Sequence, residues 1–457
     1  MLASAHAHFG ARVTYRIIRF LWRIALRTFF RRVETHGMDT IGDGPVLIVS
    51  NHTNAFIDGV LLVATLRRRV TLTAKRTLRK DPMLAVLIRA LDVVLLSRAG
   101  DNEANAAAHN LHALDTARRV LERDGVLCVF PEGISHSDPA VRPFRSGAAR
   151  IALDYAAANP GAPLRIVPMG LHYTNKGAFR SEAAVIVGAA VPLATWLSEN
   201  AASASALTTL METRVRAVTT NFADETERRL LTDAAAVVLA GRDAPTRLGT
   251  KAPPRTAELV AVIHRLQRFS GRLADAVPAE YTGLAERIRL YHRKLARLGI
   301  TPAEVNLPVH AWRAAFFVLR EAEVLLIGMP MAFWGILNNL VPYHATRRLV
   351  QKMSKDEDHF ATNAVFFGLP IFLLCALLQG LLVGVLASPL WAIPYLASLP
   401  LCGAVALLYR DRSGSMYRRV RTFLMFLRHP EHQRRLTAEA ASIIADLQRL
   451  ESQLVPT

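Results

Sequence analysis

The chain has 457 residues, with 56 lysines and arginines against 37 aspartates and glutamates, which gives a formal net charge of +19. Half of the residues are hydrophobic and only 20% are charged, a composition that excludes an intrinsically disordered chain. Three cysteines (Cys128, Cys375 and Cys402) exclude a disulfide scaffold and fit a reducing compartment. The basic excess implies a polyanionic partner, and the positive mean hydropathy favours an anionic membrane over nucleic acid.

The first 40 residues predict a helix that lies in a membrane interface. Five arginines recur every three or four residues and form one stripe on a helix: Arg12, Arg16, Arg19, Arg23 and Arg27. Apolar residues fall largely on the other side: Ile17, Ile18, Leu21, Trp22, Ala25 and Phe29. Such arginines face anionic headgroups. No uncharged run precedes a small-residue cleavage site, so the segment is not a secretory signal. An ordinary surface helix is the alternative.

Residues 45–190 alternate short β-rich runs with helical stretches. The predicted strands are 46–50, 70–74, 93–97, 126–130, 165–171 and 184–187, and the predicted helices are 59–66, 82–91, 103–123 and 146–157. This alternation predicts an α/β domain with a mostly parallel sheet flanked by helices. From 195 to about 310 the chain is expected to be mainly helical, with a proline-containing linker at 241–255.

The second half of the chain carries the most apolar segments. Residues 359–409 contain no Asp, Glu, Lys or Arg, and a spanning helix needs about 20 apolar residues. We therefore expect two spans, 363–387 and 390–409, joined by a tight turn. Basic residues flank both outer ends, which places these ends in the cytoplasm. A buried helical hairpin of a soluble domain is the alternative.

A further apolar run, 324–343, is interrupted by Pro330, Asn338 and Asn339. The residues that flank this run are basic or mixed on both sides. A single crossing would place these similar flanks on opposite sides of the membrane. We expect a re-entrant or interfacial segment there. The remaining residues, 412–457, predict a basic amphipathic helical tail.

The first candidate for chemistry is the sequence VSNHTNAFIDG, which follows the first predicted strand and contains Asn51, His52 and Asp58. A carboxylate bonded to one imidazole nitrogen fixes the tautomer and makes the other nitrogen a better base. Residues six apart lie about 240° apart on a regular helix, so the pair can meet only if the chain turns before the helix begins. A purely structural His and Asp is the alternative.

Three other motifs also fall at or near predicted strands. VFPEGISHS places Glu132 and Gly133 in a tight turn, with Ser135 as a possible hydrolase nucleophile. The G-x-S-x-G nucleophile elbow is incomplete, because Ser137 stands where its second glycine belongs. LLSRAGDN contributes Arg98, a side chain suited to a phosphate or carboxylate. In RIVPMGLHY, Pro168 shapes an apolar strand.

In order and spacing these motifs resemble the glycerolipid acyltransferase family, which includes glycerol-3-phosphate and lysophosphatidate acyltransferases. That family has an N-H-x4-D block, a block with an Arg, then F-P-E-G-x-S/T, then an apolar block with V/I-P. The resemblance covers about residues 40–190. Five residues rather than four separate His52 from Asp58. This longer loop, and HYTNKGAFRSEAAVIVG around Arg180, resemble the fungal-type glycerol-3-phosphate branch.

The resemblance implies transfer of a fatty acyl group from acyl-CoA or acyl-carrier protein to glycerol 3-phosphate or a lysophospholipid in phospholipid biosynthesis. It implies His52 as the base, Asp58 as its orienting partner, direct attack on the thioester, and no metal or other cofactor. The residues expected to bind substrate are Asn51, Arg98, Glu132, Gly133 and Ser135, with Lys75 and Arg180 adding positive charge. A serine-dependent lipid hydrolase and a non-catalytic protein that binds anionic lipid remain alternatives. Nucleic acid is disfavoured as a partner because no binding motif is present.

These expectations divide the chain into five regions and place it in a membrane, with the site on the cytoplasmic face of a bacterial inner membrane. The regions are an interfacial helix (1–40), the acyltransferase domain (41–240), a linker and helical segment (241–310), a membrane region with the hairpin (311–411) and a basic cytoplasmic tail (412–457).

Overall fold

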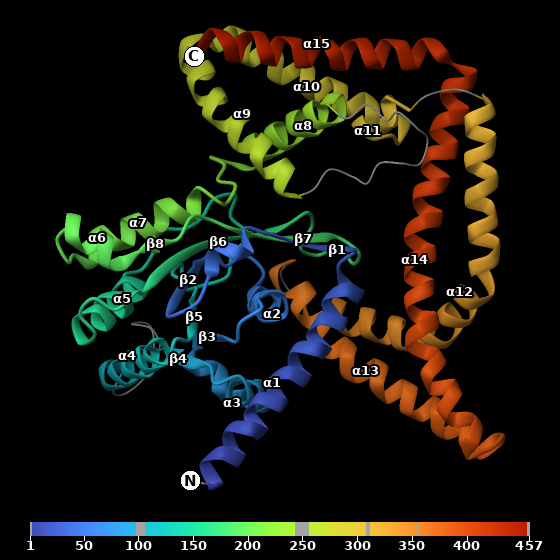
Figure 1. Cartoon of the computed structure of the whole chain (residues 1–457). Coiled ribbons are helices and arrows are strands. Elements are labelled where there is room, and N and C mark those ends of the chain that lie inside the picture. Colours follow the sequence, from blue (N-terminus) through green and yellow to red (C-terminus); the bar gives the residue numbers. More distant parts are fainter. Residues whose placement is uncertain (1, 97–105, 243–255, 308–310, 355–356, 455–457) are drawn as a thin grey trace. The chain divides into compact units, whose positions relative to one another are not determined.

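A computed structural model describes the chain except for residues 1, 97–105, 243–255, 308–310, 355–356 and 455–457 (Figure 1). The chain divides into two compact units. The first, which we call the α/β unit, comprises Met1–Asn221 and Leu349–Phe367. The second, the helical unit, comprises Phe222–Arg348 and Gly368–Thr457. The first segment of the α/β unit ends at Asn221, whereas the domain boundary predicted from the sequence lies at residue 240.

The α/β unit is built on an eight-stranded sheet with the order β1-β7-β6-β2-β5-β3-β4, and β8 also pairs with β6. The strands are β1 (Arg32–His36), β2 (Val46–Ser50), β3 (Val70–Lys75), β4 (Val94–Leu96), β5 (Val126–Val129), β6 (Arg165–Tyr173), β7 (Glu182–Val187) and β8 (Val191–Pro192). Strands β4, β3, β5, β2 and β6 are parallel to their neighbours, whereas β7 and β8 run antiparallel to β6. The predicted mostly parallel α/β fold is confirmed.

The helices of the α/β unit largely match the prediction. They are α2 (Ala55–Thr65), α3 (Pro82–Ala90), α4 (Ala106–Glu122), α5 (Gly147–Ala158), α6 (Leu193–Glu199) and α7 (Ala204–Arg216), with short 3-10 turns at Met38–Ile41 and Arg76–Lys80. Helix α2 begins four residues before the predicted start at Gly59, and this extension brings Asp58 into its first turn. The central strands have apolar side chains on both faces, since helices cover both sides of a parallel sheet. Strand β2 is accordingly buried at all five positions.

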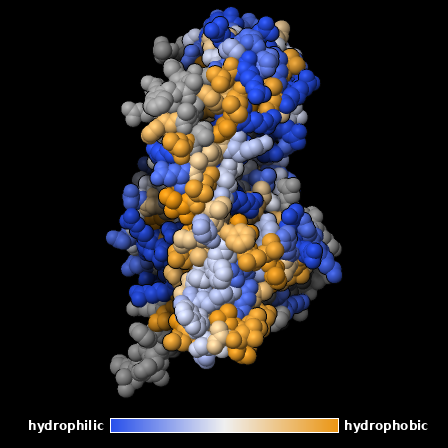
Figure 2. All heavy atoms as spheres, turned by 90° about the vertical axis from the view of Figure 1, so that its right-hand side faces the viewer, coloured by the Kyte–Doolittle hydropathy of each residue, from blue (hydrophilic) through white to orange (hydrophobic). Residues whose placement is uncertain are grey.

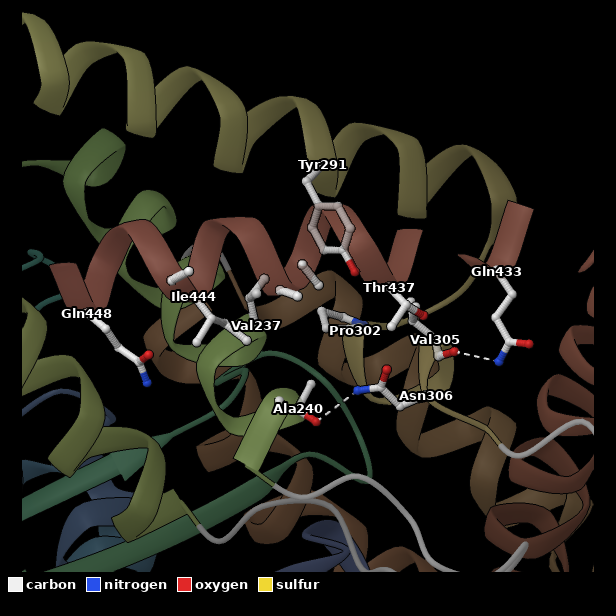
Figure 3. A pocket seen from close by; sticks show the side chains of 14 residues that line it. Val237, Ala240, Tyr291, Pro302, Val305, Asn306, Gln433, Thr437, Ile444 and Gln448 are labelled. Carbon is white, nitrogen blue, oxygen red and sulfur yellow. Dashed lines mark hydrogen bonds between the residues drawn. The ribbon is translucent and has the colours of Figure 1, made fainter. Parts of the chain in front are cut away.

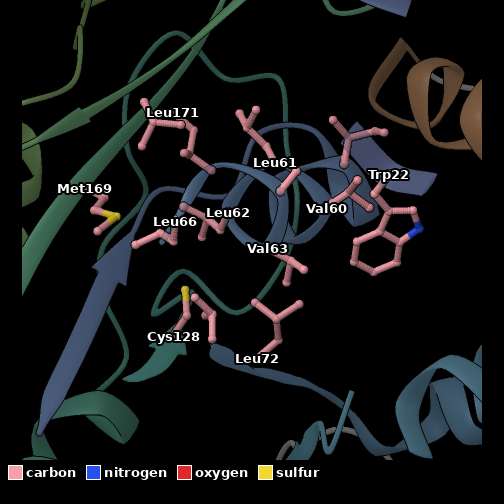
Figure 4. Packing of buried hydrophobic residues seen from close by; sticks show 14 of the residues in the cluster. Trp22, Val60, Leu61, Leu62, Val63, Leu66, Leu72, Cys128, Met169 and Leu171 are labelled. Atoms are coloured by element: carbon pink, nitrogen blue, oxygen red, sulfur yellow. The ribbon is translucent and has the colours of Figure 1, made fainter. Parts of the chain in front are cut away.

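Helix α1 (Leu2–Phe29) packs against α2 rather than lying apart from the domain. Its side chains Tyr15, Trp22 and Leu26 are buried in the core shared with α2 and the sheet. Figure 4 shows Trp22 beside α2. Arg19 donates hydrogen bonds to the carbonyl oxygens of Leu66 and Arg67, and Arg23 donates to that of Ala64 at 2.8 Å. Two of the predicted headgroup-facing arginines therefore bind the C-terminal end of α2.

The apolar side of α1 is also divided differently from the prediction. Trp22 and Phe29 lie in the protein core, whereas Ile17 belongs to an exposed apolar stripe with Val13, Phe20 and Ile24. These four residues recur at spacings of four, three and four, so they share one face of the helix. We call them the α1 stripe.

The helical unit contains a bundle with its own hydrophobic core. Its helices are α8 (Glu225–Arg242), α9 (Thr256–Ala276), α10 (Pro278–Leu298), α11 (Pro302–Val305) and α15 (Pro430–Leu454). Helix α15 buries Leu436, Ile443, Leu447 and Leu450 in that core. The segment expected to be a basic tail is thus part of the folded bundle. Acidic residues of α15 pair with arginines of other helices, as in the Arg265–Glu451 and Arg287–Asp446 pairs.

Three helices are long and apolar enough to cross a membrane, judged by length and composition: α12 (Ala311–Met353), α13 (Glu357–Leu386) and α14 (Pro389–Arg428). Figure 2 views the molecule from the right-hand side of Figure 1, where α12 and α14 lie, and shows hydrophobic side chains gathered on that surface. The two predicted spans form the hairpin of α13 and α14. The run 324–343 is helical throughout, because α12 continues through Pro330 and Pro342.

Polar side chains of these three helices bind one another. The Tyr395 hydroxyl donates to Oδ1 of Asn338 at 2.6 Å, and Nε2 of Gln379 donates to the carbonyl oxygen of Asn338 at 2.9 Å. Hydrogen bonds of this kind join helices in an apolar medium, where an unpaired polar group is costly.

Candidate active site

His52 and Asp58 meet because the chain turns between β2 and α2. Strand β2 ends at Ser50, residues 51–54 form the turn, and α2 starts at Ala55 with a positive φ of 43°. Nδ1 of His52 lies 2.9 Å from Oδ2 of Asp58. The same oxygen accepts hydrogen bonds from the backbone N–H groups of Thr53 and Asn54, both at 2.8 Å. The extra residue in the loop is thus compatible with a His–Asp pair.

Tyr173, at the end of β6, binds the carboxylate oxygen of Asp58 that His52 does not contact. Its hydroxyl donates to Oδ1 of Asp58 at 2.6 Å. Burial, and then the charge of Asp58, raise the pKa of Tyr173 well above its ordinary value, so the phenol stays protonated and remains a donor. Asp58 is fully buried and accepts four hydrogen bonds, which compensate the cost of burying its charge. Sequence reasoning noted the strand but missed this role, because it depends on which strands pair.

The imidazole of His52 is held with one nitrogen free. A carboxylate at Nδ1 assigns the proton to that atom, which leaves a lone pair on Nε2. The ring stacks on Phe130, with centroids 4.4 Å apart and an interplanar angle of 20°. The side chain is 19% exposed, and within the described part of the chain Nε2 has no hydrogen-bond partner. This nitrogen can therefore accept a proton from a bound substrate.

The predicted PEG turn lies directly beside this histidine. Gly133 has a φ of +78°, a conformation that favours glycine, and its N–H donates to the carbonyl oxygen of Phe130. Glu132 is buried, and its Oε1 accepts the backbone N–H of His52 at 2.6 Å. Ser135 Oγ accepts the backbone N–H of Ala55 at 2.8 Å. Ser135 makes no hydrogen bond to a histidine among the described residues, which weighs against its being a hydrolase nucleophile.

The other predicted site residues are placed as follows. The Asn51 amide exchanges two hydrogen bonds with the backbone of Leu171, at 3.0 and 2.7 Å. The Arg180 guanidinium donates to carbonyl oxygens at the end of α1, including that of Arg27 at 2.9 Å. Lys75 is the last residue of β3. Arg98 lies outside the described residues.

One cation beside the site was missed. The backbone N–H of Arg145 donates to the carbonyl oxygen of Pro131 at 2.9 Å, and its guanidinium Nε lies 3.1 Å from the position a Cβ on Gly133 would occupy. The side chain is exposed and has no ion pair or hydrogen bond among the described residues. Lys176 also lies close, with Nζ 3.2 Å from the carbonyl oxygen of His136. The signal was the basic sequence RPFRSG shortly after the PEG turn.

The helical unit contains two further features that could suggest a site. A cavity of about 540 Å³ between α8, α10, α11 and α15 is lined by apolar side chains with Tyr291, Asn306 and Gln433 (Figure 3). Its described lining contains no charged residue or histidine that could act as a general base. His429, Glu431 and His432 place three potential metal ligands together on the surface, a group that the expectation of no metal site overlooked. Arginines are close to this group in the sequence, at positions 428, 434 and 435.

The site places a histidine, hydrogen-bonded to a buried carboxylate, at the carboxyl ends of parallel strands, where α/β folds bind their ligands. Residues 32–172 match the family model described as Acyltransferase. Residues 32–172 thus form a domain that matches the Acyltransferase family model.

Two curated relatives and one solved structure are similar to the chain. Glycerol-3-phosphate O-acyltransferase 2 of Saccharomyces cerevisiae is 41% identical over 68 residues, 15% of this chain and 9% of the relative. An uncharacterized acyltransferase of Schizosaccharomyces pombe is 27% identical over 169 residues, 36% of this chain and 23% of the relative. The crystal structure of the 1-acyl-sn-glycerophosphate acyltransferase PlsC from Thermotoga maritima has 21% identity and a TM-score of 0.35, over 48% of this chain and 88% of that chain. The chain therefore spans less than a quarter of either curated relative.

Proposed function

We propose that the protein is a membrane-bound O-acyltransferase of phospholipid synthesis. It transfers a fatty acyl group from acyl-CoA or acyl-carrier protein to glycerol 3-phosphate or a lysophospholipid. The observation that carries the proposal is the hydrogen-bonded chain Tyr173–Asp58–His52, which ends in a free imidazole nitrogen. The similarity to a protein named as a glycerol-3-phosphate acyltransferase supports the choice of acceptor class.

In the proposed reaction, Nε2 of His52 removes the proton from the acceptor hydroxyl as its oxygen attacks the thioester carbonyl carbon. The new C–O bond forms and the C–S bond breaks. The thiolate that leaves takes the proton back from the imidazolium, which returns His52 to its neutral form. Asp58 stabilises the imidazolium between these steps, and Tyr173 holds the second oxygen of Asp58. No covalent acyl-enzyme forms.

A phosphate on the acceptor needs cations near His52. We propose that Arg145 is the principal one, because its guanidinium lies over the Gly133 turn and no described residue neutralises it. A guanidinium can bind two phosphate oxygens at once. Lys176, Lys75 and Arg98 are further candidates, and Asn51 and Arg180 support the site through the backbone contacts described above.

We propose that the membrane is crossed by the hairpin of α13 and α14. Helices α8 to α11 precede the apolar region and α15 follows it, yet they share one hydrophobic core. Both ends of the apolar region therefore lie on one side, and the number of crossings between them is even. Three crossings would violate this condition. We assign α12, whose flanks carry similar charge, to a position that does not span the bilayer.

We also propose that the α1 stripe enters the membrane interface. Its four apolar side chains are 39–62% exposed, although Tyr15, Trp22 and Leu26 of the same helix are buried. Arg16 and Arg27 lie beside the stripe, as expected for a helix between anionic headgroups and acyl chains.

Acyl transfer in membranes tests the function directly. Membranes with the wild-type chain or H52A receive radiolabelled glycerol 3-phosphate or lysophosphatidate, each with palmitoyl-CoA or palmitoyl-carrier protein. We expect product with at least one acceptor and its loss in H52A, while H112A, a change at an exposed histidine of α4, retains activity. Equal product from wild type and H52A would contradict the proposal.

A further inference from the structure

Glu132 and His136 form a buried pair next to the proposed base. Oε2 of Glu132 is hydrogen-bonded to Nε2 of His136, and Oε1 accepts the backbone N–H of His52. We propose that His136 is a positioning residue, which acts through Glu132 to fix the backbone of His52, and that Glu132 holds this loop instead of binding the acceptor. This inference rests on the proposed function, since it concerns the placement of the same base.

Burial argues against direct contact between the pair and a substrate. The side chain of Glu132 is 0% exposed and that of His136 is 3% exposed, whereas that of His52 is 19% exposed. An acceptor that reaches Nε2 of His52 would thus meet neither side chain of the pair without rearrangement.

The hydrogen bonds of His136 define its protonation. The backbone N–H of Asp138 donates to Nδ1 at 3.2 Å, so Nδ1 carries the lone pair and Nε2 carries the proton. His136 is therefore a donor to Glu132. The carboxylate of Asp138 is 3.6 Å from Nδ1 and is bonded to Nε of Arg142 at 2.5 Å.

Glu132 gathers three donors around one carboxylate. Besides His52 and His136, the backbone N–H of Arg142 donates to Oε2 at 2.8 Å. Hydrogen bonds to an ionised group are about twice as strong as neutral ones. Removal of the His136 donor would leave a buried anion short of one partner, so Glu132 would move or recruit water, and the N–H of His52 would lose its fixed acceptor.

The loop after β5 binds the catalytic loop at three points. Glu132 accepts the N–H of His52, the N–H of His136 donates to the carbonyl oxygen of His52 at 3.2 Å, and Ser135 accepts the N–H of Ala55. Both polar groups of the His52 backbone are thus held by residues 132–136. The ring can then keep one orientation, between Asp58 and Phe130.

Two substitutions of His136 test this role: one keeps a side chain that donates a hydrogen bond to Glu132, and the other removes that donor. Glutamine can donate to Glu132 from a flexible side chain, and methionine has a similar size but no N–H. The full-length variants H136Q, H136M and E132Q are compared in membranes, with H172M as a control. His172 is a buried histidine of β6 whose Nε2 lies 2.8 Å from the carbonyl oxygen of Val218.

We expect H136M and E132Q to lose kcat by roughly 10- to 100-fold, since a displacement of about 1 Å at a reacting group can cost that much. The KM values for acceptor and acyl donor should change less than about twofold. H136Q should recover most of the kcat, and H172M should behave as wild type. A raised acceptor KM at unchanged kcat would overturn the inference, because Glu132 would then contact the acceptor. Equal losses in H136Q and H136M would overturn it too.

Hydrogen exchange provides a readout that does not need activity. The peptide that contains His52 and Ala55 should exchange faster in H136M and E132Q than in wild type and H136Q, while peptides from β5 and β6 stay protected. Unchanged exchange in this peptide would refute the inference even if no acyl acceptor were found. Conversely, absence of acyl transfer by the wild-type protein together with the local exchange effect would contradict the proposed function and leave the loop contact established.

Discussion

The phenol of Tyr173 donates to one carboxylate oxygen of Asp58, and the imidazole of His52 binds the other. The tyrosine comes from the end of β6, the aspartate from the first turn of α2 and the histidine from the loop between β2 and α2. The carboxylate of Asp58, which we propose orients the base, is therefore held from the sheet as well as from its own helix.

Replacement of Tyr173 by phenylalanine keeps the ring and removes this donor. A buried acceptor that loses a partner costs about 1–3 kcal/mol, so we expect kcat to fall by roughly 5- to 100-fold. Because the pKa of Tyr173 is raised, the wild-type phenol stays a donor at pH 6 and at pH 9, and the loss in Y173F should be similar at both. Steady-state kinetics measure both effects.

Tyr155 offers a matched control for this experiment. It is buried in α5, away from His52, and Y155F should retain the wild-type kcat. An unchanged kcat in Y173F would show that the second oxygen of Asp58 needs no protein donor.

Arg145 should determine the affinity for phosphate-bearing acceptors. A hydrogen bond to a charged group contributes about 1.5–3 kcal/mol, so R145Q should raise the KM for glycerol 3-phosphate or lysophosphatidate by about 10- to 100-fold. R145K should lose less, because it keeps the charge without the bidentate geometry. The KM for the acyl donor is the internal reference, and R214Q removes an exposed arginine of α7 as a control. A rise in the donor KM alone would assign Arg145 to the acyl donor instead.

Cysteine labelling can test whether the chain crosses the membrane an even number of times between α11 and α15. In a chain whose three cysteines are replaced by alanine, a membrane-impermeant maleimide should reach A387C, in the turn between α13 and α14, from outside intact cells. S205C in α7 and A279C in α10 should react only after permeabilisation. Labelling of A279C and A387C from the same side would contradict a spanning hairpin.

The α1 stripe should lie at the depth of the acyl chains. A spin label at F20C should collide more with oxygen than with a water-soluble nickel chelate in vesicles that contain anionic lipid. A label at R16C, toward the polar edge of the same helix, should show the reverse preference. Equal preference at both positions would mean that the stripe does not contact lipid.

The fold could be predicted where burial leaves a mark on the sequence. Strands such as β2 are covered on both faces, so they read as continuous apolar runs. β1 was missed because its sequence, RVETH, is mostly polar: Arg32 pairs with Glu182 of the neighbouring strand at 2.9 Å. The role of α15 was missed because most of its residues are polar or small, although Leu436, Ile443, Leu447 and Leu450 are buried in the core of the bundle.

The site could be predicted only in part, for a different reason. His52 and Asp58 are close in the sequence and belong to a family pattern. Tyr173 and His136 act across β2, β5 and β6, and a single sequence does not reveal which strands are neighbours. Glu132 illustrates the same limit, since its position beside the base was foreseen and its bonds to the His52 backbone were not.

The arginines of α1 bind the C-terminal end of α2, and the first turn of α2 holds Asp58. Helix α2 has 11 residues, a length of about 16 Å. Helix α2 therefore connects the helix proposed to touch lipid with the loop that contains the proposed base. If α1 rests at a defined depth in the bilayer, the reacting nitrogen has a defined height above it, and the enzyme would select substrates by where their reactive groups sit relative to the membrane plane.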